Sequence, residues 1–258
     1  MQMRREERRL VQIEGRNAVL ESLRSERQIA RVILDTAAGE RDQRISEILA
    51  LCRSRDIRLA RAPRSEMDRM ARGRSHQGVI ALAEPRPSVS LDQVLDACEQ
   101  GGNDPCLLLL RQVVHEQNLG AILRTAEAAG VDAVVVPTFR GAEIGPEASR
   151  VSQGASEYVP LVRQSLTQAA AILKKRGVRL IGSDPAGKKT YWECDLTGPL
   201  CIALGGEHAG LEGPLAKRCD ELVRIPMLGR VSSLNVSVAC AILLYERMRQ
   251  SSSPARPY

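Results

Sequence analysis

Short apolar runs with the length of β-strands alternate with amphipathic helical segments along most of this 258-residue chain. The alternation occurs in two blocks, separated by the stretch EPRPSVS, which carries two prolines and no apolar period. Strands joined by helices usually form a parallel sheet with helices on both faces. We therefore expect an α/β protein made of these parts: a small α/β domain over residues 1–84, a linker over 85–104, a larger domain over 105–250 and a flexible tail over 251–258.

The individual elements follow from apolar periodicity and from the positions of Gly and Pro. In the first block we expect helices over residues 14–25, 45–56 and 65–72 and strands over 30–35, 57–62 and 78–83. We expect a short helix over 91–100 within the linker. In the second block we expect helices over 118–130, 165–177, 213–220 and 232–250 and strands over 106–113, 131–137, 178–184, 199–207 and 221–227. The last helix carries an apolar stripe at helical spacing, formed by Leu234, Val238, Ala241, Tyr245 and Met248.

The charge of the chain is unevenly distributed. Residues 1–84 hold 18 Arg, no Lys and 13 acidic residues, so nearly all of the net charge of +6 lies in the first third. Guanidinium groups suit phosphates and stacked bases, which points to nucleic acid, although an arginine-rich surface can also be merely solvated. Only 2% of residues are aromatic, so base-stacking platforms are not expected and RNA would be bound through phosphates, riboses and shape.

Several protein classes are disfavoured. There is no run of eighteen apolar residues and no signal-peptide pattern, so we expect a cytoplasmic protein with no membrane contact. The seven cysteines are scattered, none forms C-x-x-C, and there are three His, so we expect reduced thiols and no metal. A G-x-G-x-x-G turn after a strand and a G-x-x-x-x-G-K-[ST] loop are both missing, which argues against NAD enzymes and NTPases.

Three segments that follow predicted strands carry polar side chains suited to a site. In the first, NLGAILRTAEAAG, Asn118 is placed to cap the helix, and Arg124 can reach back toward the helix mouth, where a phosphate would bind. In the second, LGGEHAGLEG, paired glycines permit close backbone approach and Glu207 follows the strand. Taken alone, these features are also typical of an ordinary helix cap and of a glycine-rich turn.

The third segment, IPMLGRVSSLNVSVA, joins a proline-bearing loop to the last helix. Ser232 or Ser233 can cap this helix, which places Asn235 in its first turn. Such a helix mouth offers neutral donors and acceptors, although simple capping would account for the same residues.

Together and in this order the segments resemble the signature of SpoU/TrmH-type RNA ribose 2′-O-methyltransferases. The resemblance rests on N-L-G-A-I-x-R-T-A-E-A-x-G, E-x-x-G-L, I-P-M-x-G and S-S-L-N-V-S-V-A, and it covers most of residues 105–249. In the first block, EGRNAVLESL and SHQGVIA resemble the start and end of the small RNA-binding domain in the branch that modifies a guanosine of large-subunit (23S) ribosomal RNA.

The resemblance implies a SPOUT domain with a deep trefoil knot, S-adenosylmethionine as cofactor and a homodimer. It implies cofactor contacts from Gly205, Ile225 and Leu234. The catalytic set that it implies consists of polar residues from the three segments: Asn118, Arg124, Glu207, Ser233 and Asn235.

The roles within this catalytic set follow from general chemistry. A guanidinium keeps its proton, so we expect Arg124 to hold the adjacent phosphate and stabilise charge developing on the 2′-oxygen rather than act as a base. We expect the amides of Asn118 and Asn235 and the Ser233 hydroxyl to fix the ribose. Glu207 would orient its loop or Arg124.

Three alternatives remain open. A catalytically inactive RNA-binding assembly factor on the same fold would be indicated by loss of Arg124 or Asn235, and both are present. A transfer-RNA methyltransferase usually lacks the small first domain. An rRNA methyltransferase that confers antibiotic resistance shares the two-domain plan and is not separated by sequence.

Overall fold

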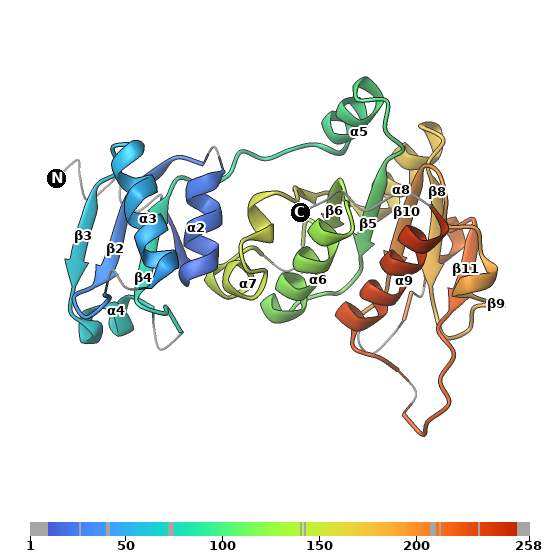
Figure 1. Cartoon of the computed structure of the whole chain (residues 1–258). Coiled ribbons are helices and arrows are strands. Elements are labelled where there is room, and N and C mark those ends of the chain that lie inside the picture. Colours follow the sequence, from blue (N-terminus) through green and yellow to red (C-terminus); the bar gives the residue numbers. More distant parts are fainter. Residues whose placement is uncertain are drawn as a thin grey trace. The chain divides into compact units, whose positions relative to one another are not determined.

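The computed structural model describes residues 10–25, 27–39, 42–71, 75–139, 141, 143–206, 210–211, 213–231 and 233–251. The chain divides into two compact units, each with its own sheet and helices, which confirms the α/β class (Figure 1). The first unit contains the residues up to Pro87 together with Glu143–Tyr158, and the second contains Ser88–Ala142 and the residues from Val159 onward. The later segment of the first unit, Glu143–Tyr158, was not anticipated by the sequence-based domain boundaries.

The first unit is built on a four-stranded mixed sheet in the order β1-β4-β2-β3. β4 pairs antiparallel with both β1 and β2, while β2 and β3 are parallel. The strands are β1 (Val11–Glu14), β2 (Ile29–Asp35), β3 (Leu59–Ala62) and β4 (Val79–Ala83), and the helices are α2 (Arg16–Arg24), α3 (Gln43–Ser54), α4 (Arg64–Met70), α7 (Pro146–Val151) and the 3₁₀ helix η2 (Ala155–Glu157).

Both faces of this sheet are covered because neighbouring strand residues point to opposite sides. Val32 and Leu34 pack in one cluster with residues of α2 and α3, whereas Ile33 packs in another with Met67 of α4. The loop and short helices after Glu143 add to the unit by packing on β1 and α2. At Gly154 the backbone of this segment lies so close to α2 that a Cβ there would fall 2.5 Å from the Glu21 side chain.

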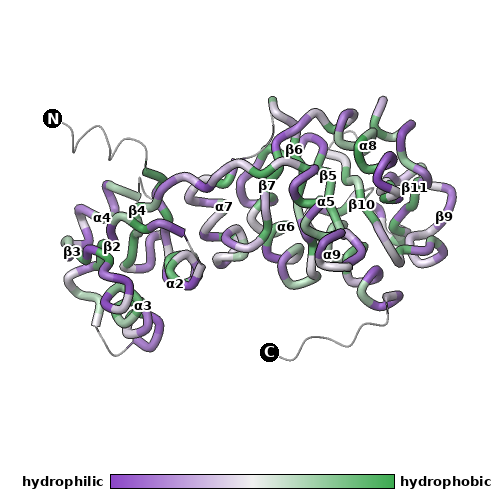
Figure 2. Tube along the Cα trace, turned by 90° about the horizontal axis from the view of Figure 1, so that it is seen from above, coloured by the Kyte–Doolittle hydropathy of each residue, from purple (hydrophilic) through white to green (hydrophobic). Residues whose placement is uncertain are grey.

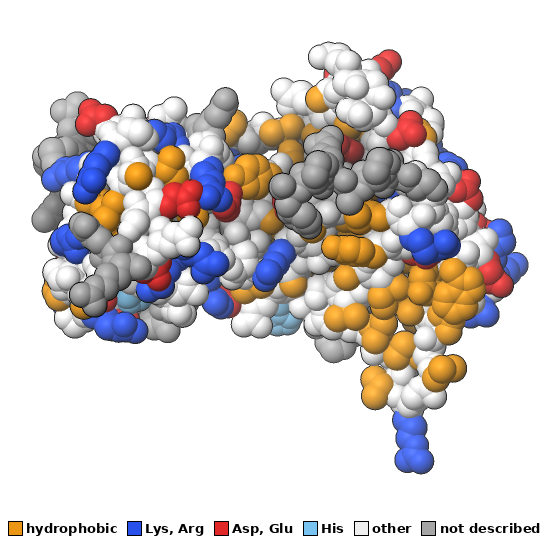
Figure 3. All heavy atoms as spheres, in the orientation of Figure 1, with side chains coloured by type: hydrophobic (Ala, Val, Ile, Leu, Met, Phe, Trp, Pro, Cys, Tyr) orange, Lys and Arg blue, Asp and Glu red, His pale blue; other side chains and the backbone are white. Residues whose placement is uncertain are grey.

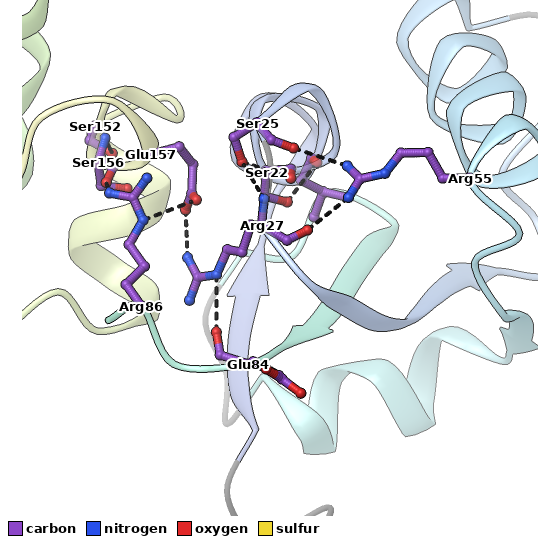
Figure 4. Close-up of polar contacts among 10 residues, drawn as sticks. Ser22, Ser25, Arg27, Arg55, Glu84, Arg86, Ser152, Ser156 and Glu157 are labelled. Carbon is purple, nitrogen blue, oxygen red and sulfur yellow. Dashed lines mark hydrogen bonds and ion pairs between the residues drawn. The ribbon is translucent and has the colours of Figure 1, made fainter. Parts of the chain in front are cut away.

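A buried carboxylate fixes this late segment to the first unit (Figure 4). The Glu157 side chain is 1% exposed, and its Oε1 lies 2.7 Å from Nη1 of Arg27 while its Oε2 lies 3.5 Å from Nε of Arg86. Arg86 also donates to the carbonyl of Ser156. Burial lowers the pKa of the Arg86 guanidinium, and the charge of Glu157 opposes that shift. The segment is therefore held by charge as well as by packing.

The second unit contains a seven-stranded sheet in the order β7-β6-β5-β10-β8-β11-β9, in which every described pairing is parallel. Its strands are β5 (Cys106–Leu110), β6 (Ala133–Val136), β7 (Leu161–Arg163), β8 (Arg179–Ser183), β9 (Lys189–Thr190), β10 (Leu200–Leu204) and β11 (Glu221–Arg224). Its helices are α5 (Leu91–Gln100), α6 (Glu116–Ala128), α8 (Leu166–Lys175) and α9 (Val236–Gln250), with the 3₁₀ helices η3 (Tyr191–Glu193) and η4 (Ala216–Arg218).

Helices cover both faces of the second sheet. α5 and α8 pack on one face against Leu107, Leu109 and neighbouring strand residues, while α6 and α9 contact each other and α9 contacts β10 (Figure 1). The central strands β5 and β10 are buried throughout and hydrophobic, as expected for a parallel sheet (Figure 2). This arrangement brings the carboxyl ends of the strands to one edge, where ligands bind in open α/β sheets.

Several predicted elements need correction. Two strands were missed because they are too short to show an apolar pattern. β1 has four residues between the charged start of the chain and Gly15, and β7 has three. The helix predicted over residues 213–220 is wrong: the structure has only the three-residue η4 there, and Gly213, at the start of the predicted range, has a φ of +82°, which is not helical. α9 begins at Val236 rather than at residue 232.

The apolar stripe predicted on the last helix does not face the core. α9 buries Val236, Cys240, Leu243 and Leu244 instead. Two members of the predicted stripe, Val238 and Tyr245, are 46% and 53% exposed.

Candidate methyltransferase site

A pocket of about 520 Å³ lies at the carboxyl ends of β8, β10 and β11 and at the start of α9. Its lining includes the three predicted cofactor residues, Gly205, Ile225 and Leu234, and one residue of the predicted catalytic set, Ser233. The pocket thus collects residues that were singled out from separate sequence segments. Its other walls include Ser183, Asp184 and Pro185 after β8 and the apolar side chains of Met227, Val236 and Ala239.

Glycine is required where the pocket wall folds back on itself. A Cβ on Gly205 would fall 2.0 Å from the carbonyl carbon of Gly210, a distance that no side chain can occupy. Gly206 and Gly210 form an antiparallel bridge, and the φ of Gly210 is +54°. The paired glycines that follow the strand therefore permit two backbone segments to touch and shape the pocket.

Asp184 holds this wall in place, and sequence reasoning did not single it out. Its Oδ2 accepts a hydrogen bond from the backbone N–H of Leu211 at 3.0 Å, and its Oδ1 accepts one from Ala186 at 2.8 Å. The carboxylate therefore connects the loop after β8 to the wall after β10. The available signal was an acidic residue at the end of a predicted strand, which is where open α/β sheets place ligand-binding groups.

The start of α9 joins the start of α6 through two asparagines. Asn235 is the N-cap of α9, and its Oδ1 accepts a hydrogen bond from the backbone N–H of Ser237 at 2.8 Å. Its Nδ2 donates to Oδ1 of Asn118 in the first turn of α6, at 3.1 Å. Because Asn235 lies between the pocket-lining residues Leu234 and Val236, this pair stands beside the pocket.

The two asparagines have exchanged their predicted positions. Asn118 was expected as the cap of its helix, but α6 is preceded by His115 at the cap and Asn118 lies inside the first turn. Asn235 was expected inside the first turn, but it is itself the cap of α9, the position that was expected for a preceding serine. Both residues still place their side chains at helix mouths.

Of the two remaining predicted catalytic residues, the structure describes Arg124 but not Glu207. Arg124 lies on the exposed side of α6, two turns beyond its start. Glu207 lies outside the described residues, as does Ser232, which was expected only as a possible helix cap. The structure therefore groups Asn118, Ser233 and Asn235, with Arg124 on the helix that carries Asn118. Within the described part of the chain, no group of three or more His, Cys, Asp or Glu could hold a metal ion.

Comparison with known proteins identifies the family. The profile of the SpoU rRNA Methylase family matches residues 105–245, and that of the RNA 2′-O ribose methyltransferase substrate-binding domain matches residues 12–89.

Two bacterial relatives share the name 23S rRNA (guanosine-2′-O-)-methyltransferase RlmB. The one from Photobacterium profundum is 41% identical over 212 residues, covering 81% of this chain and 85% of that protein. The one from Bordetella pertussis is 39% identical over 238 residues, covering 92% of this chain and 96% of that protein. The crystal structure of an AdoMet-bound rRNA methyltransferase from Sinorhizobium meliloti matches with a TM-score of 0.78 at 25% identity, covering 98% and 92% of the two chains.

This chain belongs to the SpoU rRNA methylase family. It is an RNA ribose 2′-O-methyltransferase that depends on S-adenosylmethionine, which confirms the family, enzyme class and cofactor expected from sequence. Family membership also implies the SPOUT fold with its trefoil knot.

Proposed function

We propose that this enzyme methylates the 2′-hydroxyl of a guanosine in 23S rRNA, in the cytoplasm and as a homodimer. The carrying observation is the pocket lined by Gly205, Ile225 and Leu234, with the Asn118–Asn235 pair beside it. The names of the relatives from Photobacterium and Bordetella support the choice of 23S rRNA, since both match most of the chain.

The pocket has the chemistry that S-adenosylmethionine requires. Ile225, Leu234 and Met227 offer apolar walls for an adenine ring, and the backbone at Gly205 offers hydrogen-bonding groups. The Asp184 carboxylate lines the same pocket and suits a cofactor that carries positive charge. When bound, the cofactor supplies an electrophilic methyl group on a sulfonium, so no metal or redox partner is needed for the transfer.

The protein's own residues then orient the ribose and stabilise its oxygen. We assign the Asn118 and Asn235 amides and the Ser233 hydroxyl to ribose positioning, because they gather at the start of α9. Arg124 holds the adjacent phosphate and stabilises negative charge developing on the 2′-oxygen. Glu207 is assigned to the orientation of its loop or of Arg124, on sequence grounds alone. Precise alignment of this kind contributes roughly 7–11 kcal/mol to catalysis in favourable cases.

The first unit is assigned to RNA binding. Its family profile is that of a substrate-binding domain, and Arg58, Arg61 and Arg64 are exposed on and beside its edge strand β3. Exposed guanidinium groups on one edge suit the phosphates of structured RNA.

An uncovered apolar face on the second unit supports the homodimer. Trp192 in η3, Tyr245 on α9 and Leu228 after β11 are 50%, 53% and 102% exposed. Hydrophobic side chains gather on one face of this unit (Figure 3). An apolar patch of this kind marks an interaction surface, and two-fold pairing is the commonest way to cover it. Sedimentation should give a dimer that Tyr245→Glu dissociates and that Leu59→Glu, in the first unit, leaves intact. A monomeric and fully active wild-type enzyme would contradict the proposal.

A cytoplasmic location is consistent with the free thiols. None of the seven cysteines forms a disulfide, and six of them are buried. No helix in the described ranges is both long enough and apolar enough to cross a membrane.

The decisive experiment maps 2′-O-methylation across ribosomal and transfer RNA from cells with and without this protein. We expect one guanosine of 23S rRNA to lose its methyl group when the protein is missing and to regain it with purified enzyme and S-adenosylmethionine. Loss of a transfer-RNA methyl group instead would support the transfer-RNA alternative. RNA binding with no methyl transfer to either RNA would support the assembly-factor alternative.

A further inference from the structure

A second pocket, of about 460 Å³, opens in the second unit at the carboxyl ends of β5, β6 and β7. Its walls come from the loops after β5 and β6, from the start of α8 and from Pro214 and Leu215. Small-molecule sites usually enclose about 300–1,000 Å³, so this pocket has room for a nucleoside. None of the residues assigned above to cofactor binding or catalysis lines it.

The mouth of this pocket carries the one phenylalanine of the chain. Phe139 lines the pocket, yet 84% of the residue is exposed to solvent. Leaving such a ring in water forgoes about 1.5–3 kcal/mol of burial, in a chain of which 2% is aromatic. An exposed ring beside a pocket is the arrangement on which proteins stack unpaired RNA bases. Aromatic stacking, which composition argued against, is therefore available beside this pocket, at Phe139.

The polar groups of the pocket complement a base edge. The side-chain oxygens of Ser165 and Thr167 lie 3.1 Å apart, and each hydroxyl can donate and accept. Arg111 is half-buried in the wall, and its Nη1 lies 3.4 Å from the carbonyl oxygen of Gly210. A guanidinium has five N–H donors, so Arg111 retains donors for a ligand.

The pocket shares a wall with the cofactor pocket. Gln112 lines the second pocket, and a Cβ on Gly206 in the first would fall 2.7 Å from the Gln112 Cβ. The φ of Gln112 is +58°, a left-handed conformation that is strained for a residue with a side chain and that concentrates at functional sites. Arg111 reaches the same wall at Gly210. A group in the second pocket therefore lies directly behind the loop that shapes the cofactor site.

We propose that this pocket receives one unstacked nucleobase of the RNA substrate, held against the ring of Phe139. The proposal rests on the assignment of RNA as substrate. A base fits better than a protein side chain because the site combines an exposed ring, two hydroxyls and a guanidinium in a space of nucleoside size. Continuity with the cofactor pocket places such a base near the nucleotide that is methylated.

The single phenylalanine makes a direct test possible. Protein produced with 4-fluorophenylalanine carries one fluorine label, at position 139, and therefore gives one ¹⁹F resonance. The cofactor site is first filled with S-adenosylhomocysteine, and the four nucleoside 5′-monophosphates are then titrated separately. We expect a saturable shift with at least one of them and no shift with ribose 5-phosphate, which has the sugar and phosphate but no base.

Activity provides an independent measurement. We expect Phe139→Leu to lower kcat/KM for 23S rRNA by roughly 5- to 150-fold, the range for loss of one base–aromatic stack, and Phe139→Tyr to restore most of it. The affinity for S-adenosylmethionine, measured by calorimetry, should be unchanged. Val114→Ala is the matched control, because Val114 is also exposed, at 58%, but lines neither pocket.

Either measurement can overturn the proposal. A resonance that no nucleotide moves, or that ribose 5-phosphate moves equally, would exclude a base site. A shift on protein dilution without nucleotide would assign the ring to a protein interface instead. If wild-type enzyme fails to methylate 23S rRNA, the proposed function fails, while the resonance still decides whether the pocket binds a base.

Discussion

The side-chain amide of Asn235 connects two helices that begin 120 residues apart. Its oxygen accepts from the backbone and hydroxyl of Ser237, and its nitrogen donates to Asn118 at 3.1 Å. Because both ends of the amide are engaged, its orientation is fixed by the local hydrogen bonds. The residue thus caps α9 and aligns it with α6 at the edge of the cofactor pocket.

Substitutions at Asn235 should separate these two roles. Asn235→Asp retains the acceptor for Ser237 but has no donor for Asn118, so it should unfold within about 0.5 kcal/mol of wild type in urea. Asn235→Ala loses the cap as well and should be less stable by about 1 kcal/mol. Both variants should lose roughly 10²-fold in the rate of methyl transfer, since each loses a preorganised donor. Wild-type activity of Asn235→Asp would contradict this assignment.

Arg124 distinguishes an electrostatic clamp from a base. If it acts as a clamp, Arg124→Lys keeps the charge but loses the planar fork, so single-turnover rates should fall yet remain measurable. Arg124→Ala should lose about 10²–10³-fold, and cofactor affinity should be unchanged in both variants. If Arg124 were the base, the Lys variant would match Ala at pH 7 and recover about tenfold per pH unit toward the ordinary Lys pKa near 10.4. Rates measured from pH 7 to 10 decide between the two.

Gly205→Ala should disrupt the cofactor pocket. The added Cβ would lie 2.0 Å from the Gly210 backbone, so the wall must move. Calorimetry should show S-adenosylmethionine affinity lower by tenfold or more, which corresponds to about 1.4 kcal/mol. Gly229→Ala is the matched control, because an added Cβ there meets no described atom within 4 Å. Equal affinities in the two variants would mean that the wall does not shape the site.

Glu157→Gln should destabilise the first unit. The substitution leaves Arg27 and Arg86 without their buried counter-charge, which should cost about 3 kcal/mol in urea unfolding. Glu47→Gln is the control, because its partner Arg24 is 44% exposed and such surface pairs contribute about 0–1 kcal/mol. A loss for Glu157→Gln no greater than for Glu47→Gln would show that the buried carboxylate does not hold the segment.

The buried thiols should make the second unit sensitive to alkali. Burial raises the pKa of Cys106 to about 11, so the folded state resists forming a thiolate that the unfolded chain forms near pH 9. The stability linked to this thiol is complete below pH 9 and is lost as pH rises toward 11. The difference in unfolding free energy between wild type and Cys106→Ala should therefore shrink between pH 8 and 10.5. A difference independent of pH would contradict this.

The larger elements could be predicted because their patterns are long. Strands such as β5 are apolar throughout, and helices such as α8 are followed by glycines such as Gly177. The apolar pattern therefore indicated the type of each element, and the glycines indicated where the helices end. Gly205, Ile225 and Leu234 were found only because the resemblance joined three segments, since nothing in each segment alone shows that they line one pocket.

What could not be predicted depends on tertiary contacts. Asn118 and Asn235 both suit a cap or a first turn, so the sequence does not show which position each takes or that their side chains are hydrogen-bonded to each other. Glu157 reads as an ordinary acidic residue in a loop, and its partners Arg27 and Arg86 are 130 and 71 positions away. A sequence pattern of local period carries no information about such distant neighbours.

The first unit is built from two separate stretches of the chain, and this has a consequence during protein synthesis. Arg27 and Arg86 leave the ribosome well before Glu157, and at about 5–20 residues per second the delay after Arg86 is roughly 4–14 seconds. By then β5, α6 and β6 have already emerged. The nascent RNA-binding unit must therefore wait, with two uncompensated guanidinium groups, for a piece of chain that is translated in the middle of the catalytic half. The first unit can therefore finish folding only while the methyltransferase unit is being synthesised.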